Sequence, residues 1–252
     1  MKFFFLLFLV SPGWLYADWN VIQRRDSTTS KGEATASELT LSDGASRAEV
    51  QLVYFTPTDI RFETVTNLDG NIQGVRDAVD SRGGFAGING GYFEANLDPL
   101  GLLISNNRVL HPLQKAKLLS GIFFVRNGRP ELTRAPEFPG VKGVQQAIQC
   151  GPFLVDGGRV VPGLNDQRVA PRTFVFTCGT SLWGFGVCRS VTLKEIGEIL
   201  AHAKVILEHP IIRALNFDGG SSTAFYVKLE GSVIFSEGRS VVSNYLVVRP
   251  KN

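Results

Sequence analysis

The sequence predicts an α+β fold, a single domain with a central, largely antiparallel β-sheet and two main helices. Many short apolar segments bounded by turn residues indicate strands, whereas only residues 72–81 and 192–207 carry apolar residues at helical spacing. No Pro/Ser-rich linker and no change of composition divides the chain. Runs of strands with few helices are typical of α+β proteins rather than of parallel α/β sheets.

The strands are predicted from runs of β-branched and aromatic residues that end at Gly, Pro, Asn, Asp or Ser. Residues 18–47 are polar, and short strands are expected there around a loop at residues 27–30. Asn127-Gly128 marks a tight turn, and residues 105–107 connect a hairpin. A strand and a tight turn are expected within residues 151–160, and the remaining strands are expected at residues 48–55, 60–65, 100–104, 108–110, 121–125, 145–150, 172–178, 183–190, 211–215, 224–227, 233–235 and 245–248.

Both helices are predicted from apolar residues that recur every three or four positions. In residues 72–81 the pattern is carried by Ile72, Val75 and Val79. The stripe in residues 192–207 is longer and consists of Leu193, Ile196, Ile199, Leu200, Ala203 and Leu207. The hairpin before this helix turns at residues 179–182, so we expect Cys178 to face Trp183.

The N-terminus has the pattern of a secretory signal peptide. Lys2 precedes an apolar run at residues 3–10 that is too short to cross a bilayer, and the small residue Ala17 precedes Asp18. We expect cleavage after Ala17, which would leave residues 18–252 as a secreted or periplasmic domain with no transmembrane segment. An uncleaved membrane anchor is the alternative interpretation of the same residues.

The composition is that of an ordinary globular domain. Hydrophobic residues make up 44% and charged residues 19% of the chain, which is compatible with a sizeable core. The formal net charge is only +3, and no run of Lys and Arg is present. Since nucleic-acid binding requires concentrated positive charge, we expect no nucleic-acid partner.

Cysteine and histidine usage argues against a disulfide scaffold, a metal centre and a catalytic triad. The cysteines permit either one disulfide with one free thiol or three thiols. No Cys/His spacing resembles a metal site, so we expect no cofactor, and a requirement for a divalent cation stays open. No histidine has a recognisable triad partner and Gly-x-Ser-x-Gly is absent, so serine hydrolase chemistry is disfavoured. The residues concerned are Cys150, Cys178, Cys188, His111, His202 and His209.

The most informative stretch is residues 216–223, Asn-Phe-Asp-Gly-Gly-Ser-Ser-Thr, which lies between two predicted strands. It brings together one carboxylate, Asp218, two glycines and three hydroxyls. Adjacent glycines allow a ligand to approach the backbone, and hydroxyl and N–H groups can bind a sugar or an anion. On local grounds a tight turn between strands explains Asp-Gly-Gly equally well.

A second stretch, residues 85–93, has the same layout around Asn89-Gly90-Gly91. Each stretch follows a predicted helix, which suggests a degenerate internal duplication that places Asn89 and Asp218 in related settings. Coincidence is the alternative, because the chain contains 27 glycines. Arg172 follows Pro171 at the start of a strand, where it either binds phosphate through its planar guanidinium or forms a surface salt bridge.

Several short motifs follow one another between residues 80 and 250. They are residues 87–93 (GINGGYF), Pro99 with Gly101, residues 150–152 (CGP) with 156–158 (DGG), residues 170–173 (APRT), Thr192-Leu193 and residues 216–223. In this order they resemble the motifs of the phosphodiester glycosidase domain family. The resemblance implies an exported α+β hydrolase that cleaves a sugar-1-phosphodiester at the anomeric carbon. The products would be the free sugar and a phosphomonoester.

For that reaction, physical chemistry assigns roles to single residues. Asp218 would face the sugar as nucleophile, base or hydroxyl acceptor, and Asn89 would bind a sugar hydroxyl or acetamide. Arg172, with the N–H groups near Gly90-Gly91 and Gly219-Gly220, would hold the phosphate.

The remaining candidates are side chains beside these two stretches. Tyr92 is a possible stacking wall for the sugar. Glu94 and Asp156 are candidates for a second carboxylate, whose distance from Asp218 bears on a retaining or inverting outcome. The hydroxyls expected to bind substrate are those of Ser221, Ser222 and Thr223.

A function of a different class competes with hydrolysis. A non-catalytic exported protein could bind an envelope polysaccharide or exopolysaccharide through the same cleft, since turns rich in glycine and hydroxyl groups serve binding as readily as catalysis. Release of sugar from a phosphodiester separates the two functions.

Overall fold

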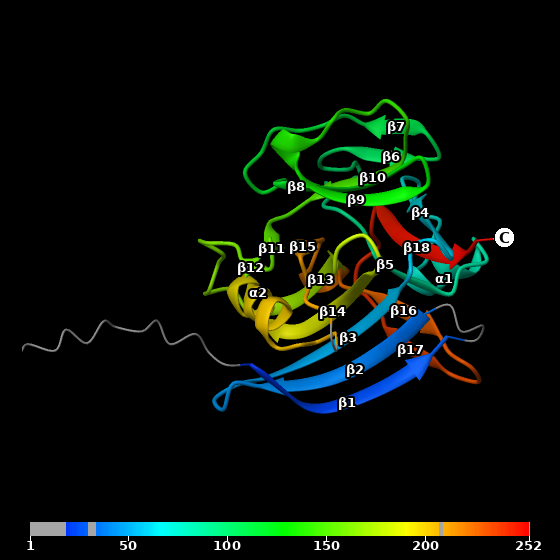
Figure 1. The fold of residues 1–252 in the computed structure, drawn as a ribbon. Coiled ribbons are helices and arrows are strands. Elements are labelled where there is room, and N and C mark those ends of the chain that lie inside the picture. Colours follow the sequence, from blue (N-terminus) through cyan, green and yellow to red (C-terminus); the bar gives the residue numbers. More distant parts are fainter. Residues whose placement is uncertain (1–18, 30–33, 207–208, 252) are drawn as a thin grey trace, which may run out of the picture.

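The computed structural model describes residues 19–29, 34–206 and 209–251. These residues form three antiparallel sheets and two α-helices, which confirms the predicted α+β class (Figure 1). The central sheet of the prediction is an eight-stranded sheet with the order β1-β2-β3-β14-β13-β15-β11-β12. Its strands are β1 (Asn20–Thr28), β2 (Ala34–Ser42), β3 (Arg47–Phe55), β11 (Phe153–Asp156), β12 (Arg159–Val160), β13 (Ala170–Thr177), β14 (Trp183–Val191) and β15 (Arg213–Asn216).

Two five-stranded sheets accompany the large one, with the orders β7-β6-β10-β8-β9 and β17-β16-β5-β18-β4. The first, at the top of Figure 1, consists of β6 (Leu103–Ser105), β7 (Arg108–His111), β8 (Gly121–Arg126), β9 (Arg129–Arg134) and β10 (Val144–Cys150). The second consists of β4 (Ile60–Thr66), β5 (Ala86–Asn89), β16 (Phe225–Lys228), β17 (Val233–Ser236) and β18 (Asn244–Pro250). Two short 3-10 helices, η1 (Ala135–Glu137) and η2 (Gly220–Ser222), lie in the connections.

The helices are shorter than their apolar patterns predict. α1 covers Val75–Asp80 and α2 covers Leu193–His202. α2 begins with a capping box, in which the Thr192 hydroxyl accepts from the Glu195 N–H and the Glu195 carboxylate accepts from the Thr192 N–H. Its expected last residue, Leu207, lies outside the described residues.

Several buried apolar cores join these elements. The largest core lies between the eight-stranded sheet and the smaller sheets and includes Val187, Phe217 and Phe225. A second core packs α2 on the other face of the eight-stranded sheet, where Figure 1 draws the helix beside β12 and β14. α1 covers the outer face of the sheet that contains β5. The large sheet is therefore a middle layer, with α2 on one face and the two smaller sheets on the other. Segments from different sheets meet where its strands end.

Several sequence expectations need correction in register or length. Trp183 pairs with Thr177 rather than with Cys178, whose N–H instead bonds the Leu182 carbonyl at 2.9 Å inside the turn. β1 and β2 are nine residues each, much longer than expected, because polar residues on one sheet face are compatible with long antiparallel strands. Ser27 and Thr28 belong to β1 and not to a loop.

The cysteines lie inside or partly inside this packing. Cys150, Cys178 and Cys188 are all free thiols.

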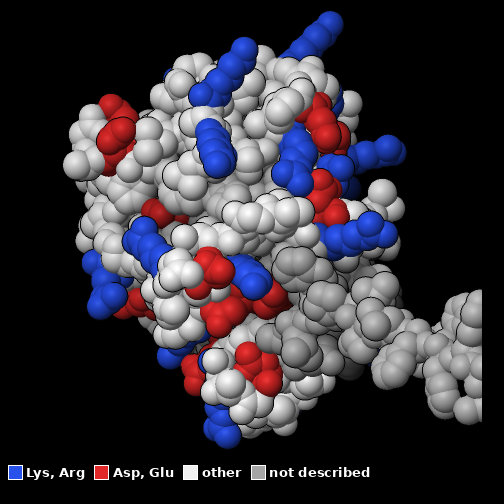
Figure 2. Space-filling view, turned by 90° about the vertical axis from the view of Figure 1, so that its left-hand side faces the viewer, with Lys and Arg blue, Asp and Glu red and all other residues white. Residues whose placement is uncertain are grey.

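No helix within the described ranges has the length and apolarity needed to cross a bilayer. Acidic and basic side chains are interspersed on the face drawn in Figure 2. The predicted signal peptide at residues 1–17 lies outside the described residues.

Candidate functional site

The two Gly-Gly stretches meet where β5 and β15 end. Asn89 is the last residue of β5, and its Nδ2 donates to the Asp218 carbonyl at 2.8 Å. The Asp218 N–H in turn donates to the Gly90 carbonyl at 3.1 Å. The two stretches are therefore joined directly by reciprocal hydrogen bonds, although their strands belong to different sheets.

Asn89 holds this junction together. Its side chain is fully buried, and its Oδ1 accepts from the Thr173 hydroxyl at 2.8 Å and from the Ala224 N–H at 3.0 Å. Its amide thus fixes β13, the Asp218 turn and the start of β16 in one place. We expected Asn89 to contact a sugar; the structure gives it a positioning contact to Asp218 instead.

Glycine is required in both stretches because the backbones approach closely. A Cβ at Gly90 would lie 1.8 Å from Asn244 Oδ1, and a Cβ at Gly219 would lie 2.7 Å from the Pro171 carbonyl oxygen. Real Cβ atoms do not tolerate such distances, so a side chain would force the segments apart. The Gly-Gly pairs bring the carboxylate turn against β13 and β18.

Asp218 is half-buried and retains contact with solvent. Its Oδ1 accepts from the Gly219 N–H at 2.9 Å. Burial raises the pKa of this carboxyl above its ordinary 3.8, and the Ser222 hydroxyl, the Gly219 N–H and the charge of Arg168 oppose that shift. A partly desolvated carboxylate held by hydrogen bonds is suited to interact with positive charge that develops on a substrate.

Tyr92 forms a buried polar cluster beside Asp218. Its hydroxyl donates to the Gly151 carbonyl at 2.6 Å and accepts from Asn216 Nδ2 at 3.1 Å. Burial, followed by nearby Cys150 and Asp218, raises the Tyr92 pKa, so the phenol stays protonated. Instead of a free stacking wall, Tyr92 is a half-buried ring whose hydroxyl is held inside the protein.

Cys150 lies in the same cluster and is not an activated nucleophile. It is fully buried, and burial followed by the charge of Asp218 raises the pKa of its thiol. Since the thiolate is the reactive form, a thiol of this kind is inert.

Arg172 is directed mainly at the protein backbone. It is 8% exposed, its Nε donates to the Val191 carbonyl at 3.1 Å, and a terminal nitrogen donates to the Arg168 carbonyl. Burial, followed by the charge of Arg168, lowers the Arg172 pKa. We expected the Arg172 guanidinium to bind a phosphate. Two of its nitrogens donate instead to backbone carbonyls, and the bond to Arg168 holds the loop that carries that residue.

Arg168 is an accessible cation at this edge. It is exposed, it lowers the pKa of Asp218 through its charge, and its guanidinium has no ion-pair partner in the described part of the chain. Its backbone N–H donates to Asn165 Oδ1 at 2.8 Å, which shapes the loop locally. Arg168 was absent from the residues proposed from the sequence.

The expected phosphate-binding N–H groups differ in availability. Those of Gly90 and Gly91 donate to the Asn244 carbonyl at 2.8 Å and to its Oδ1 at 3.0 Å. That of Gly219 donates to the Asp218 carboxylate. The N–H groups of Gly220 and Ser221 have no acceptor among the described residues. Ser221 is exposed, whereas Ser222 and Thr223 are buried.

Neither candidate second carboxylate is connected to Asp218. Glu94 is exposed, and its backbone N–H bonds the Asp98 carbonyl at 2.8 Å. Asp156 forms ion pairs with Arg134 at 2.9 Å and Arg213 at 3.2 Å. The described residues also contain no group of three or more His, Cys, Asp or Glu side chains placed to hold a metal.

Some residues of the site were not proposed from the sequence although they lie inside the motifs noted there. These are Cys150 in CGP, Thr173 in APRT and Asn216 in NFDGG. The motifs marked the right segments, but the contacts of these side chains could not be predicted from neighbouring residues. Asn244 has no motif around it. Its importance arises from long-range pairing of β18 with β5, which aligns Tyr245 with Asn89.

Comparisons with known proteins bear on both the family and the fold. The model of the phosphodiester glycosidase family matches residues 82–249. The catalytic domain of zebrafish N-acetylglucosamine-1-phosphodiester alpha-N-acetylglucosaminidase, auto-inhibited by its pro-peptide, is similar with a TM-score of 0.66 and 13% identity over 91% of this chain and 88% of that one. A hypothetical protein from Synechocystis has a TM-score of 0.61 and 15% identity over 87% of this chain and 62% of that one. A comparison with curated protein sequences found no match.

Proposed function

The chain belongs to the phosphodiester glycosidase family, and on this premise we propose that it hydrolyses a sugar-1-phosphodiester at the anomeric carbon. The products are the free sugar and a phosphomonoester. The observation that carries the proposal is the half-buried Asp218 carboxylate, fixed where the two Gly-Gly stretches meet and next to the exposed Arg168. The expectation of export, which rests on residues 3–17, is part of the same proposal.

Asp218 acts on the sugar side of the bond. Cleavage of a glycosidic bond passes through a transition state with positive charge at the anomeric carbon. A carboxylate in a partly desolvated position stabilises that charge more than one in water, because the local dielectric is lower. Asn89 and Gly219 hold the Asp218 turn before substrate binds, so little reorganisation is needed.

Arg168 acts on the phosphate side. A phosphomonoester leaving group is already a weak base, so holding its negative charge matters more than protonating it. A guanidinium binds phosphate oxygens through paired hydrogen bonds, and the N–H groups of Gly220 and Ser221 add donors. Arg172, bonded to the Arg168 carbonyl, positions this loop.

The experiment compares the wild type with Asp218→Asn on a sugar-1-phosphodiester such as UDP-N-acetylglucosamine or a sugar 1-(aryl phosphate). Released sugar and phosphomonoester are quantified, and free-sugar binding and thermal melting are measured in parallel. We expect the wild type to release sugar and Asp218→Asn to fold but to lose roughly 100- to 1,000-fold in turnover, the effect of removing one preorganised electrostatic group.

Near-normal turnover by folded Asp218→Asn would remove Asp218 from the mechanism. Sugar binding by the wild type without any release would instead establish a non-catalytic glycan-binding protein.

A further inference from the structure

β4, the edge strand of the second five-stranded sheet, leaves part of its backbone unpaired. On one side it pairs with β18, and the flanking bonds fix which of its residues take part. The Asn67 N–H donates to the Ser243 carbonyl at 2.7 Å, and the Lys251 N–H donates to the Asp59 carbonyl at 2.9 Å. Backbone groups of successive residues in a strand point to opposite edges, so the odd-numbered residues of β4 bond β18 and the even-numbered residues face outward.

Two of the outward-facing residues, Ile60 and Phe62, keep free backbone groups. None of their N–H and carbonyl groups has a hydrogen-bond partner among the described residues. The next outward-facing residue, Thr64, is bonded by side chains of the neighbouring sheet. Its N–H donates to Gln146 Oε1 at 3.0 Å, and its carbonyl accepts from the Ser105 hydroxyl at 2.7 Å. The open stretch at Ile60 and Phe62 therefore ends at Thr64.

These free groups lie in a groove between two sheets, which we call the edge groove. Its volume is about 430 Å³, within the range of ligand sites. Residues 60–63 of β4 line one side, and the turns at residues 106–107 and 127–128 line the other. In Figure 1, β4 lies below the upper sheet, whose strands β6 and β10 it contacts. The unpaired backbone therefore faces polar turns across an open groove rather than another strand.

The edge groove carries an excess of positive charge. Arg61, Arg249 and Lys251 line it, against one carboxylate, that of Glu63. Glu63 is already paired with Arg249 at 3.3 Å and with Arg82 at 3.6 Å. Arg61 and Lys251 are exposed, and neither has an ion-pair partner within the described ranges. A ligand with negative charge would meet two free cations beside the unpaired backbone.

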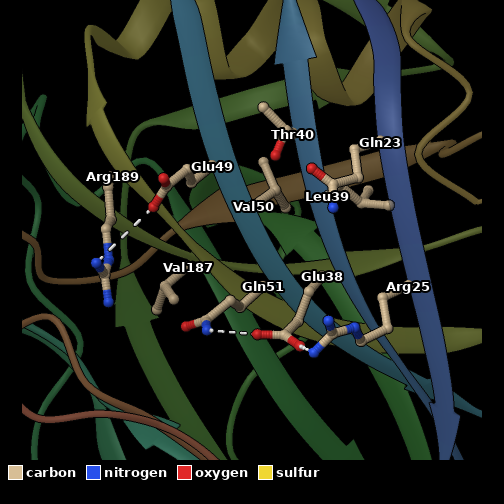
Figure 3. A pocket seen from close by; sticks show the side chains of 10 residues that line it. All are labelled: Gln23, Arg25, Glu38, Leu39, Thr40, Glu49, Val50, Gln51, Val187 and Arg189. Carbon is tan, nitrogen blue, oxygen red and sulfur yellow. Dashed lines mark hydrogen bonds and ion pairs between the residues drawn. The ribbon is translucent and has the colours of Figure 1, made fainter.

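The depression over β1, β2, β3 and β14, shown in Figure 3, lacks both properties. The strands β2, β3 and β14 are paired on both sides. The charges on this surface are balanced, with Arg25 at 3.9 Å from Glu38 and Arg189 at 3.8 Å from Glu49. A solvated face of an antiparallel sheet explains this depression without a ligand.

The spacing of the free backbone groups indicates what can fill the edge groove. They recur on every second residue, about 6.8 Å apart, which is the repeat of another β-strand. An extended peptide that adds to an open sheet edge makes use of this repeat. The ladders of this sheet are all antiparallel. We propose that the edge groove binds an extended acidic segment of another protein, which adds to β4 as an antiparallel strand.

The side chains beside the open edge define the sequence of the added strand. On its outer face the strand lies beside Arg61, where acidic side chains form cross-strand ion pairs. On its inner face it lies beside Ile60, Phe62 and Val125, where small apolar side chains fit. In an antiparallel pair, the residues whose N–H groups bond Ile60 and Phe62 share their inward direction. The competing explanation is an edge left to solvent, with Arg61 and Lys251 as charges that oppose edge-to-edge pairing.

No residue that lines the edge groove belongs to the candidate site, so the inference is independent of the proposed hydrolysis. The probe is the peptide acetyl-Asp-Val-Asp-Val-Asp-Val-amide, compared with the same peptide N-methylated at its valines or at its aspartates. Methylation of the valines removes the N–H groups that would bond β4, whereas methylation of the aspartates removes those on the far side. A peptide with lysine in place of aspartate tests the role of charge.

Binding is followed by NMR of the protein, with amide hydrogen exchange measured at single residues. The amides of Ile60 and Phe62 report on the open edge, and that of Thr64, already bonded to Gln146, is the internal reference. The variant Arg61→Ala tests the outer face of the added strand. Its matched control is Arg47→Ala, which removes an exposed arginine from β3.

We expect the unmodified and the aspartate-methylated peptides to bind and to slow exchange at Ile60 and Phe62. The valine-methylated peptide should bind roughly tenfold more weakly, as for the loss of two hydrogen bonds. Arg61→Ala should weaken binding roughly two- to fivefold, the effect of one cross-strand ion pair, and Arg47→Ala should not. Unchanged exchange at Ile60 and Phe62, or equal binding of the valine-methylated and unmodified peptides, would overturn the inference. Equal binding of the lysine peptide would overturn the assignment of an acidic partner.

Discussion

Asp218 combines two properties that usually oppose each other, a raised pKa and a set of hydrogen bonds to its charged form. Burial dominates, while the contacts from Ser222 and Gly219 offset part of its effect. The carboxylate is therefore destabilised in the folded protein relative to an exposed one. The ionised Asp218 therefore does not stabilise the folded protein, and the rest of the fold holds it in place. This is typical of functional carboxylates.

The raised pKa predicts how stability and activity depend on pH. The protonated form is favoured by folding, so the ionised Asp218 lowers the free energy of unfolding as pH rises from 3.8 through the raised folded value. Asp218→Asn should therefore be at least as stable as the wild type at neutral pH, and this advantage should shrink below pH 3.8. Because the ionised carboxylate is the form proposed to act in catalysis, kcat/KM should decrease as Asp218 becomes protonated. The midpoint of this decrease should lie above pH 3.8.

Urea unfolding and a pH–rate profile test this prediction. Asp69→Asn, at an exposed position, is the control. A marked loss of stability in Asp218→Asn at neutral pH would show that the carboxylate is a structural part of the Gly219-Gly220 turn.

The two arginines of the site should respond differently to substitution. Arg168→Ala removes an exposed cation and should lower kcat/KM for a phosphodiester by roughly 10- to 100-fold, as expected for a hydrogen bond to a charged group. Binding of the free sugar and the melting temperature should change little. Arg172→Lys breaks bonds to the Val191 and Arg168 carbonyls and should lower both the melting temperature and the activity.

Arg129→Ala, at an exposed position in β9, is the control for this pair. Equal kcat/KM for Arg168→Ala and Arg129→Ala would contradict a phosphate-binding role for Arg168.

The junction of β5 and β18 has no tolerance for an added methyl group. A Cβ at Gly90 would meet Asn244 Oδ1 at 1.8 Å and the Asn244 carbonyl oxygen at 2.9 Å. Gly90→Ala should therefore destabilise the protein by about 1–3 kcal/mol, the usual cost of overpacking. At Gly74 a Cβ would meet only Glu237, at 3.8 Å, and Gly74→Ala is the matched control.

Chemical unfolding of both glycine variants gives the comparison. A Gly90→Ala protein as stable as Gly74→Ala would mean that β5 and β18 can separate without loss, which the hydrogen bonds of Asn244 to Gly90 and Gly91 do not permit.

Local patterns predicted most elements well because their signals are local. The Asn127-Gly128 turn, with φ of 50° and 72°, joins β8 to β9 as expected for this dipeptide. The helix that begins at Leu193 was predicted from Thr192, which caps it, and from the apolar stripe that follows. The register of the β13–β14 hairpin was missed by one residue, because Cys178 is drawn into the turn by its bond to Leu182.

The site was only partly predictable, because its contacts join distant segments. The duplication of the Gly-Gly stretches suggested that Asn89 and Asp218 lie together, and their hydrogen bond shows that they do. The direction of the Arg172 side chain, the exposure of Arg168 and the partners of Asn244 depend on how three sheets pack. None of these follows from the residues adjacent to them in the sequence.

For the whole chain, the N-terminal residues predict export. N-terminal sequencing of the protein recovered outside the cytosol of its native host should begin at or near Asp18. Recovery of the intact chain from the cytosol would contradict the prediction.

The central claim is that water attacks the sugar and not the phosphorus, since Asp218 is proposed to stabilise charge at the anomeric carbon. Hydrolysis of a sugar-1-phosphodiester in ¹⁸O-labelled water, followed by ³¹P NMR of the product, tests this directly. The account predicts a phosphomonoester without the label, and loss of its formation in Asp218→Asn. Label in the phosphomonoester would establish attack at phosphorus and contradict the assignment of this site as a glycosidase.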